Sequence, residues 1–551
     1  MSENRRIVRA AGLVGLLTLV SRIAGLVRDS VVGYYFGTGM AADAFFVAFR
    51  LPNLLRRFVA EGAMSGAFIP VFTEYLTNRS RQEAVAAASA LATVMAAGLA
   101  VLVGVGVVFA PTWTALFAPG FVEEPARFAL TVTLTRLVLP YIFLISLVAL
   151  ASGMLNSLRH FATPAVSPVF LNLSMIAAAV FLCPHLAVPV HGLAYGVLIG
   201  GVCQLAVQIP PLLRHGVRIV PLWRPRHAAV RRTLGLLTPM VFGAAVYQIN
   251  VLVGTVLASV LPTGSVSYLW YAGRVFEFPL GIFTVALGTA ALPSFAAQAV
   301  RGARDELRHS LTFSIRLTNF IVLPATVGIM VLAIPITSVL FQRGAFGYGE
   351  SVLTARALIA FAVGLWSVSM VRLLVPAFYA LHDTRSPVIA AAVGFAANAG
   401  CSVLLMGPVP VVGTSWLAGA IGALARTLWV FDLRHVGLAL ATSLAALVNM
   451  ILLAALLRRH LGQLGVAELL PSFVRSLLAS LAMIPVLHYI AGLADWSQGG
   501  ALLVHAAVLL VAILGGGGVF AGVALLLGGD EAKAAVRDVR ERWARTGSLR
   551  R

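Results

Sequence analysis

The stretch SRIAGLVRDSVVGYYFGTGMAADAFFVAFRLPNLLRRFVAEGAMSGAFIPVFTEY (residues 21–75) is apolar enough to enter a lipid bilayer, and yet it carries many charges. These charges include Arg22, Arg28, Asp29, Asp43, Arg50, Arg56, Arg57 and Glu61. A charged side chain at the middle of a membrane helix costs about 2.5–3.5 kcal/mol even on the mildest insertion scale. We therefore expect these side chains to line a polar, water-filled cavity, and the excess of arginine predicts that the cavity binds an anion.

The composition of the whole chain is that of a membrane protein. Of its 551 residues, 60% are hydrophobic and only 11% are charged, and the mean hydropathy is +0.94. A soluble protein contains about 25% charged residues, so the chain is expected to be a polytopic helical membrane protein. The net charge of +20 comes mostly from arginines in short loops. Such loops follow the positive-inside rule, so nucleic acid is not an expected partner.

Apolar runs of about 20 residues, the length that crosses a bilayer, predict about fourteen spans. We place them near residues 10–35, 41–73, 85–111, 127–157, 162–184, 191–213, 233–261, 267–298, 309–341, 351–381, 386–407, 434–458, 472–492 and 501–528. The apolar stretch 416–430 is left open as a re-entrant, interfacial or spanning segment. Basic loops alternate with loops poor in arginine, which favours an even number of spans and two cytoplasmic termini.

Four landmarks recur in the sequence at offsets of 223 to 226 residues. The pairs are Gly39 and Gly264, Pro70 and Pro293, Pro164 and Pro387, and Arg5 and Arg231. Each repeat holds six spans, an even number, so the two copies are expected to be related by a pseudo-two-fold axis along the membrane normal, with a substrate path between them. The predicted domains are an N-lobe (1–220), a C-lobe (221–460), two further helices (461–528) and a basic cytoplasmic tail (529–551).

Helical spacing groups some of the polar side chains. Ser21, Gly25 and Arg28 share one helix face, on which Gly25 allows a ligand or a neighbouring helix to come close. Arg22 and Asp29 share another face.

Prolines interrupt the helices that carry the other polar candidates. Pro52 is predicted to kink or break its helix, so that Asn53 faces the same region as Arg56. Arg274 and Glu277 are three residues apart and are expected to touch, with a break at the following Pro279. Arg372 precedes Pro376 in the tenth span.

Two interpretations of the arginines remain open. In the first, a set of them converges on a phosphate-bearing group, because guanidinium offers paired donors that fit phosphate oxygens; this set is Arg22, Arg28, Arg56 and Arg274. In the second, each arginine is merely paired with a carboxylate, as in Arg57–Glu61, Arg274–Glu277 or Arg22–Asp29. No carboxylate at helical spacing neutralises Arg28 or Arg56, which favours a binding role for these two. The acids Asp29, Asp43 and Glu61 are interpreted as cavity-shaping or gating groups, with a role as proton carriers as the less favoured alternative.

The chain is not expected to be an enzyme. It has no Walker loop, no Ser/His/Asp arrangement and no cluster with metal-ligand spacing, and its three cysteines follow no metal or disulfide pattern. No DxD-type carboxylate pair lies in an external loop, which argues against a polyprenyl-phosphate glycosyltransferase.

Residues 21–75 closely resemble the signature of the MurJ (MviN) lipid II flippases, of the multidrug/oligosaccharidyl-lipid/polysaccharide exporter superfamily. The resemblance continues in APGF (118–121), LPYIFLISLVAL (139–150), SVSYLWYAGRVFEFPLGIFTVALGTAALPS (265–294) and FQRGAF (341–346). It covers most of residues 5–400 and then weakens. It implies fourteen helices, in two six-helix lobes plus two C-terminal helices that form a lipid-tail groove.

The resemblance also implies a function in peptidoglycan biosynthesis. The substrate would be lipid II, the undecaprenyl-pyrophosphate-linked disaccharide-pentapeptide, moved to the outer leaflet of the bacterial inner membrane by a monomer, with cell-wall synthesis machinery as a candidate partner. The positions that match the family's functional residues are Ser21, Arg22, Arg28, Arg56 and Arg274 for the substrate, and Asp29, Asp43, Glu61, Glu277 and Arg372 around the cavity. The chain departs from the family at Gly273, where some members carry Asp, and in an apparent insertion at 411–430.

No cofactor is expected, and the membrane potential is the expected driving force. Bound sodium or chloride is left open, since only Asn250 lies near the position of the acid that binds sodium in some members of the family. One alternative is an exporter of polysaccharide precursors or drugs from the same superfamily, although drug exporters take cations. The other alternative is a non-transporting scaffold of the cell-wall machinery, in which the arginines are purely structural.

Overall fold

The computed structural model describes residues 3–58, 64–409, 415–462, 465–534 and 537. Within these residues the secondary structure is helical apart from one isolated β-bridge, Met406 with Asp432. Nine of the described helical segments, or ten if one bent pair counts as a single span, are long and apolar enough to cross a membrane. The prediction of an all-α polytopic membrane protein is confirmed.

The described helices outside this set explain why the predicted count is higher. The side chains of the first residues of α1 (Glu3–Phe36) lie outside the described part of the structure, the predicted second span is divided between α2 (Met40–Phe58) and α3 (Met64–Asn78), and the predicted eighth span is divided at Pro279. A divided helix is too short to count as a single span, although a membrane protein tolerates such breaks where they face protein or water. The total of fourteen spans stays a prediction.

The packing of the chain defines two compact units. Unit 1 comprises Met1–Ser267 and Val409–Ala423, and unit 2 comprises Tyr268–Pro408 and Leu424–Arg551. The predicted lobe boundaries at residues 220 and 460 rest on the sequence repeat rather than on packing, and they stay a prediction.

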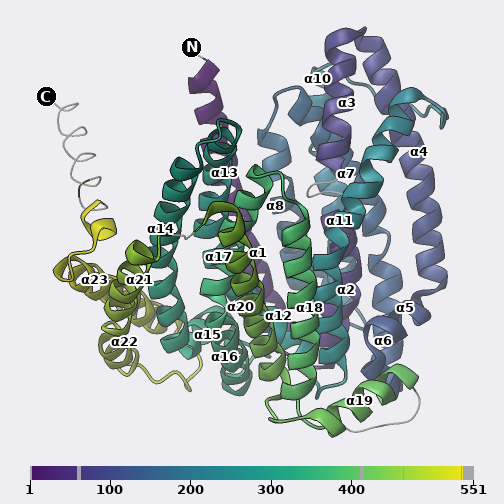
Figure 1. Ribbon diagram of the computed structural model, residues 1–551. Coiled ribbons are helices and arrows are strands. Elements are labelled where there is room, and N and C mark those ends of the chain that lie inside the picture. Colours follow the sequence, from purple (N-terminus) through teal and green to yellow (C-terminus); the bar gives the residue numbers. More distant parts are fainter. Residues whose placement is uncertain (1–2, 59–63, 410–414, 463–464, 535–536, 538–551) are drawn as a thin grey trace, which may run out of the picture. The chain divides into compact units, whose positions relative to one another are not determined.

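Unit 1 contains the helices of the first half of the chain (Figure 1). They are α1, α2, α3, α4 (Arg81–Val108), α5 (Ala110–Phe117), α6 (Pro125–Val138), α7 (Tyr141–Ser157), α8 (Ala162–Ala177), α9 (His191–Ala206), α10 (Ile209–Arg214) and α11 (Ala228–Ser259). A buried aromatic and aliphatic core that includes Phe68, Phe72 and Leu155 joins α3, α4 and α7. α11 belongs to this unit because it packs against α3 and α4.

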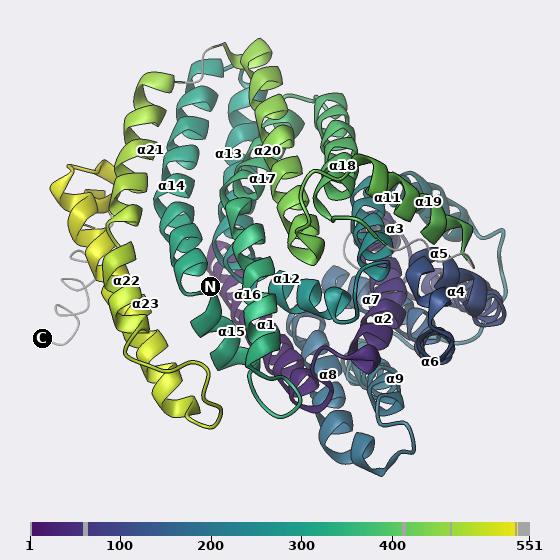
Figure 2. The ribbon, with the colours of Figure 1, turned by 90° about the horizontal axis from the view of Figure 1, so that it is seen from below.

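Unit 2 begins within α12 (Figures 1 and 2). Its helices are α12 (Ser265–Pro279), α13 (Val285–Val300), α14 (Arg304–Val331), α15 (Ala333–Phe341), α16 (Tyr348–Val363), α17 (Leu365–Ala380), α18 (Arg385–Leu405), α20 (Arg434–Leu461), α21 (Val466–Leu481), α22 (Ile484–Ala491) and α23 (Leu502–Leu526). α14 and α21 lie side by side, and Arg316 of α14 bonds to Asp530 (2.8 Å) and Glu531 (2.6 Å), just beyond α23.

The two prolines singled out in the sequence behave differently. Pro52 was expected to kink or break its helix; α2 continues as a helix through this residue, so it does not break there, and a kink stays a prediction. The expected break at Pro279 is confirmed, because α12 ends at this residue and a π-helical turn follows at Leu280–Thr284. A membrane helix tolerates a proline wherever neighbouring groups satisfy the carbonyl that it frees.

The open stretch of the sequence, 416–430, contains α19 (Trp416–Leu428). A helix of 13 residues is about 20 Å long and cannot cross a hydrocarbon core of about 30 Å. The chain also returns to its starting point, since the Val430 N–H donates to the Leu404 carbonyl (2.8 Å). α19 is therefore not a span, and α18 and α20 enter and leave the membrane as antiparallel neighbours.

Glycines set the distance between α8 and α9 in unit 1. Gly192, Gly196 and Gly200 recur every four residues and form one face of α9. A Cβ at Gly196 would lie 2.6 Å from the Ala178 Cβ, and one at Gly200 would lie 2.9 Å from the Leu171 Cα. Small residues at such a face allow two membrane helices to approach closely.

We predict that Gly196→Val destabilises the protein by about 1–3 kcal/mol, the usual cost of overpacking a tight site. Thermal unfolding of the purified protein in detergent measures the effect. Gly98→Val in α4 is the matched control, because a Cβ there meets no atom within 4 Å. Equal unfolding temperatures for the two variants would contradict the close packing of α8 and α9.

Candidate functional site

Arg28 lies in the C-terminal third of α1 with 6% of its surface exposed. Its Nε and Nη2 donate to Asp29 Oδ1 at 3.0 and 2.7 Å, and its Nη1 donates to Asn172 Oδ1 of α8 at 3.1 Å. The guanidinium group therefore bridges an acid on its own helix and an amide on the neighbouring helix. A buried charge needs such partners, because its desolvation is otherwise very costly.

The face of α1 that was recognised in the sequence is the face that meets α8. Asn172 Nδ2 donates to the Ser21 carbonyl at 3.1 Å, and a Cβ on Gly25 would lie 3.6 Å from the same nitrogen. Of the two roles considered for Gly25, the close approach of a neighbouring helix is the one observed. Asn172 was missed in the sequence, where an isolated amide in the apolar run 162–184 was the available signal.

The pairing of the arginines in α1 differs from both interpretations of the sequence. Arg28 does have a carboxylate partner, Asp29, although adjacent residues on a helix do not usually face each other. The long arginine side chain folds back to reach the acid while it also reaches Asn172. Arg22 is half-buried and makes no hydrogen bond or ion pair within the described residues, so it does not pair with Asp29.

Asp43, at the start of α2, is completely buried and accepts four hydrogen bonds. Its Oδ2 accepts from Arg127 Nη2 and from the Gly264 N–H (2.7 Å), and its Oδ1 accepts from the N–H (2.9 Å) and the hydroxyl of Ser267. Ser267 lies in the first turn of α12, where backbone N–H groups lack helical partners. These hydrogen bonds therefore connect α2 with α6 and with the segment that follows α11.

Arg127 of α6 is the counter-ion of Asp43, with only 1% of its surface exposed. It also donates to Glu124 (3.1 Å), and its guanidinium carbon lies 3.7 Å from the centre of the Phe121 ring. Arg127 was not among the residues singled out in the sequence, although it stands at the edge of a predicted span and six residues after APGF. Its partner in the chain is 84 residues away, so no local pattern reveals the pair.

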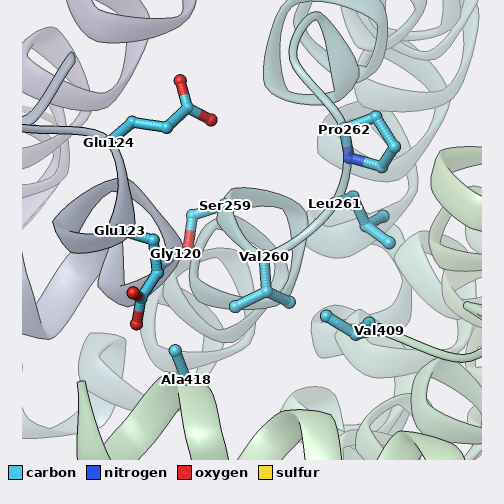
Figure 3. Close-up of a pocket in the computed structure, with 9 residues that line it drawn as sticks. All are labelled: Gly120, Glu123, Glu124, Ser259, Val260, Leu261, Pro262, Val409 and Ala418. Carbon is cyan, nitrogen blue, oxygen red and sulfur yellow. Dashed lines mark hydrogen bonds between the residues drawn. The ribbon is translucent and has the colours of Figure 1, made fainter. Parts of the chain in front are cut away.

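A cleft of about 220 Å³ lies beside this cluster in unit 1 (Figure 3). The residues that line it are Gly120, Glu123, Glu124, Ser259, Val260, Leu261, Pro262, Val409 and Ala418. The Gly120 backbone approaches α11 so closely that a Cβ would lie 2.2 Å from the Ser259 carbonyl oxygen. Ser415, just before α19, donates its N–H to Glu123 at 3.2 Å.

The structure describes only some of the other candidate site residues on α2 and just after it. Asn53 is half-buried in α2, and Arg50 donates to the Thr255 hydroxyl of α11. Arg56 and Arg57 lie in the last turn of α2, but their side chains are outside the described part of the structure. Glu61 lies outside the described residues altogether.

In unit 2, Arg274 of α12 bonds to Glu277 at 3.4 Å, so the expected contact is confirmed. The guanidinium carbon of Arg274 also lies 4.7 Å from the centre of the Trp270 ring. Arg372 of α17 is exposed and makes no hydrogen bond or ion pair within the described residues. In the same part of the chain, no three His, Cys, Asp or Glu side chains gather as they would around a metal ion.

The helical arrangement, with charged groups held inside apolar helices, defines a class of protein: an α-helical polytopic membrane protein. A solved inward-facing multidrug resistance MATE transporter of the MOP superfamily shares the fold, with a TM-score of 0.59, 14% sequence identity and coverage of 81% of this chain and 99% of that one. A solved structure described as lipid II flippase MurJ, inward closed conformation, is more similar, with a TM-score of 0.73, 25% identity and coverage of 92% and 98%.

The family model for lipid II flippase MurJ matches residues 32–431. The lipid II flippase MurJ of Burkholderia cenocepacia is 36% identical over 497 residues, which is 89% of this chain and 91% of that protein. The probable lipid II flippase MurJ of Vibrio cholerae is 37% identical over 480 residues, or 85% of each chain. The chain belongs to the MurJ lipid II flippase family, whose members are transporters rather than enzymes.

We predict that Arg127→Ala destabilises the protein by about 3–5 kcal/mol, because it leaves the Asp43 carboxylate buried without its counter-ion. Adding Asp43→Asn removes the stranded charge and should recover part of the loss. Thermal unfolding of the two single variants and the double variant forms a double-mutant cycle. Strictly additive effects would show that the two side chains do not act as a pair.

Proposed function

We propose that this protein moves lipid II from the inner to the outer leaflet of the bacterial cytoplasmic membrane by alternating access. The observation that carries the proposal is membership of the MurJ family over residues 32–431, together with 36% identity to a flippase over 89% of the chain. The buried arginine of α1 supports it, because the link between the polyprenyl tail and the head group of this substrate is an anionic diphosphate.

Arg28 is the first proposed ligand of the diphosphate. A guanidinium group offers several N–H donors in one plane, which match phosphate oxygens. In the structure, Asp29 accepts from two nitrogens of Arg28 and Asn172 accepts from a third. Diphosphate would replace the Asp29 carboxylate at Nε and Nη2, while Asn172 keeps Nη1 in place.

Because Asp29 and the diphosphate compete for Arg28, Asp29 would help to release the substrate as well as pair with Arg28. While substrate is absent, Asp29 compensates the buried charge of Arg28. While substrate is bound, the same carboxylate lies beside a second anion and repels it, which prevents binding from becoming too tight for transport. The gating role predicted for Asp29 thus has a physical basis in its contact with Arg28.

The remaining proposed ligands are Ser21, Arg22, Arg56 and Arg274. Arg22 makes no competing ion pair within the described residues and is available to an anion. Arg274 repeats the arrangement of Arg28 within unit 2, since it too is held by a nearby acid, Glu277. Glu277, Asp43, Asn53, Glu61 and Arg372 are proposed to shape or gate the cavity rather than to bind the diphosphate directly.

The proposed topology completes the account. Both termini face the cytoplasm, the two lobes comprise residues 1–220 and 221–460, and the polyprenyl tail stays in lipid along residues 461–528. The lobes rock about an axis along the membrane normal, as other transporters with parallel repeats do. The protein acts as a monomer, and the cell-wall synthesis machinery is a proposed partner.

We predict that the variant Arg28→Ala/Asp29→Asn abolishes transport while the protein stays folded. The second substitution avoids a stranded carboxylate, so the loss reports on the missing guanidinium. The measurement is the sidedness of lipid II in cells depleted of the wild-type protein. Arg301→Ala is the control, because Arg301 is exposed and paired with an exposed glutamate. A scaffold role predicts instead that sidedness stays normal as long as the protein is abundant.

We also predict that collapse of the membrane potential slows transport. An inside-negative potential favours outward movement of an anion by about 2.3 kcal/mol per charge per 100 mV. Two diphosphate charges that cross the whole field would therefore gain about 4–5 kcal/mol per 100 mV. Lipid II sidedness followed after addition of a potassium ionophore tests the coupling. Unchanged transport at zero potential would contradict it.

A further inference from the structure

The chain leaves the helical bundle of unit 2 after α18 and returns to it before α20 through a narrow neck. The neck is closed by the β-bridge between Met406 and Asp432 and by two backbone hydrogen bonds, from Val430 N–H to the Leu404 carbonyl (2.8 Å) and from Leu433 N–H to the Leu405 carbonyl (3.1 Å). The chain therefore departs and returns at the same level, where α18 ends and α20 begins.

Gly407 is built into this neck. Its φ of 78° is disfavoured for residues with a Cβ, and a Cβ there would lie 2.2 Å from Asp432 Oδ1. The two segments of the neck are therefore held in close contact by specific backbone interactions. The neck fixes the points where the chain leaves and rejoins the bundle to the membrane face opposite the loop that precedes α18.

The surface of the segment that returns to the neck is apolar and exposed. Leu424 and Leu428 of α19 are exposed, and Trp429, Val430 and Phe431 follow with 45%, 58% and 58% of their surfaces exposed. The sequence from 409 to 431 contains no acidic residue and a single charge, that of Arg426. A continuous exposed apolar surface of this kind marks an interaction site.

The same surface continues onto two helices, α18 and α20, that are long and apolar enough to cross a membrane. Leu404 at the end of α18 and Leu433 before α20 are exposed apolar residues on either side of the neck, and both helices are candidate spans. A neighbouring protein could bind this surface only if it displaced lipid from the ends of α18 and α20. Continuity with the membrane-facing surface therefore favours lipid as the occupant.

We propose that α19 and the segment Trp429–Phe431 lie in the lipid–water interface and anchor the insertion to the membrane surface. An interfacial helix places its apolar face below the head groups and its basic side chains among them, which suits the exposed leucines and Arg426. Indole rings prefer the same depth, because they are amphipathic. The ligand of this surface is phospholipid, bound independently of the transported substrate.

A single fluorescent label tests the proposal. In a variant whose native cysteines are replaced, Leu428→Cys is labelled with an environment-sensitive dye and reconstituted into phospholipid nanodiscs. We expect strong quenching by lipids with a nitroxide near the head group, and several-fold slower quenching by aqueous iodide than for a label at Gln498→Cys. Gln498 is the matched control, since it lies in an exposed polar loop of the same unit.

Two quenching results would overturn the proposal that the segment lies in the interface. Iodide quenching as fast as at Gln498 would overturn the proposal, because the surface would then face water. Quenching mainly by nitroxides near the ends of the lipid acyl chains would overturn it as well, because the segment would then be deeply inserted.

The double substitution Trp429→Ser/Phe431→Ser should raise the access of iodide to the label at position 428 without lowering the unfolding temperature. No change in access would show that these two residues do not hold the segment in the interface.

Discussion

The cost of a charge inside an apolar helix is the constraint on which the rest of this structure depends. Arg28 and Arg127 are both buried guanidinium groups, and each is held by a carboxylate together with at least one neutral polar group. An unpaired charge in these places would unfold the protein or stay out of the membrane. The polar contacts of these arginines therefore help to determine which helices lie together, α1 with α8 through Asn172 and α2 with α6 through Asp43.

The two pairs nevertheless suit different roles. Asp43 uses all its acceptor positions to join α2, α6 and the first turn of α12, which leaves little capacity for a ligand. Arg28 is held by its own neighbour in the chain and by one amide of α8. A partner on the same helix can be exchanged for a bound anion without moving a helix. This difference is why transport is assigned to the surroundings of Arg28 and structural cohesion to Asp43.

Much of this architecture could be predicted from local patterns. Hydropathy revealed a polytopic helical protein, helical spacing revealed the Ser21–Gly25–Arg28 face and the Arg274–Glu277 contact, and Pro279 marked a break. The partners Asn172 and Arg127 could not be predicted, because they lie 144 and 84 residues from the side chains that they bind. The stretch 416–430 stayed ambiguous because hydropathy reports apolar content, whereas only the backbone bonds of the neck show that the chain returns to its starting point.

The central claim is that arginine side chains recognise the diphosphate of the substrate. Equilibrium binding to the purified protein in nanodiscs tests it most directly, with lipid II compared against an analogue that carries an uncharged linkage in place of the diphosphate. The account predicts much tighter binding of lipid II, and a preference that largely disappears in Arg28→Ala/Asp29→Asn. Equal binding of the two lipids, or a preference that survives in that variant, would contradict it.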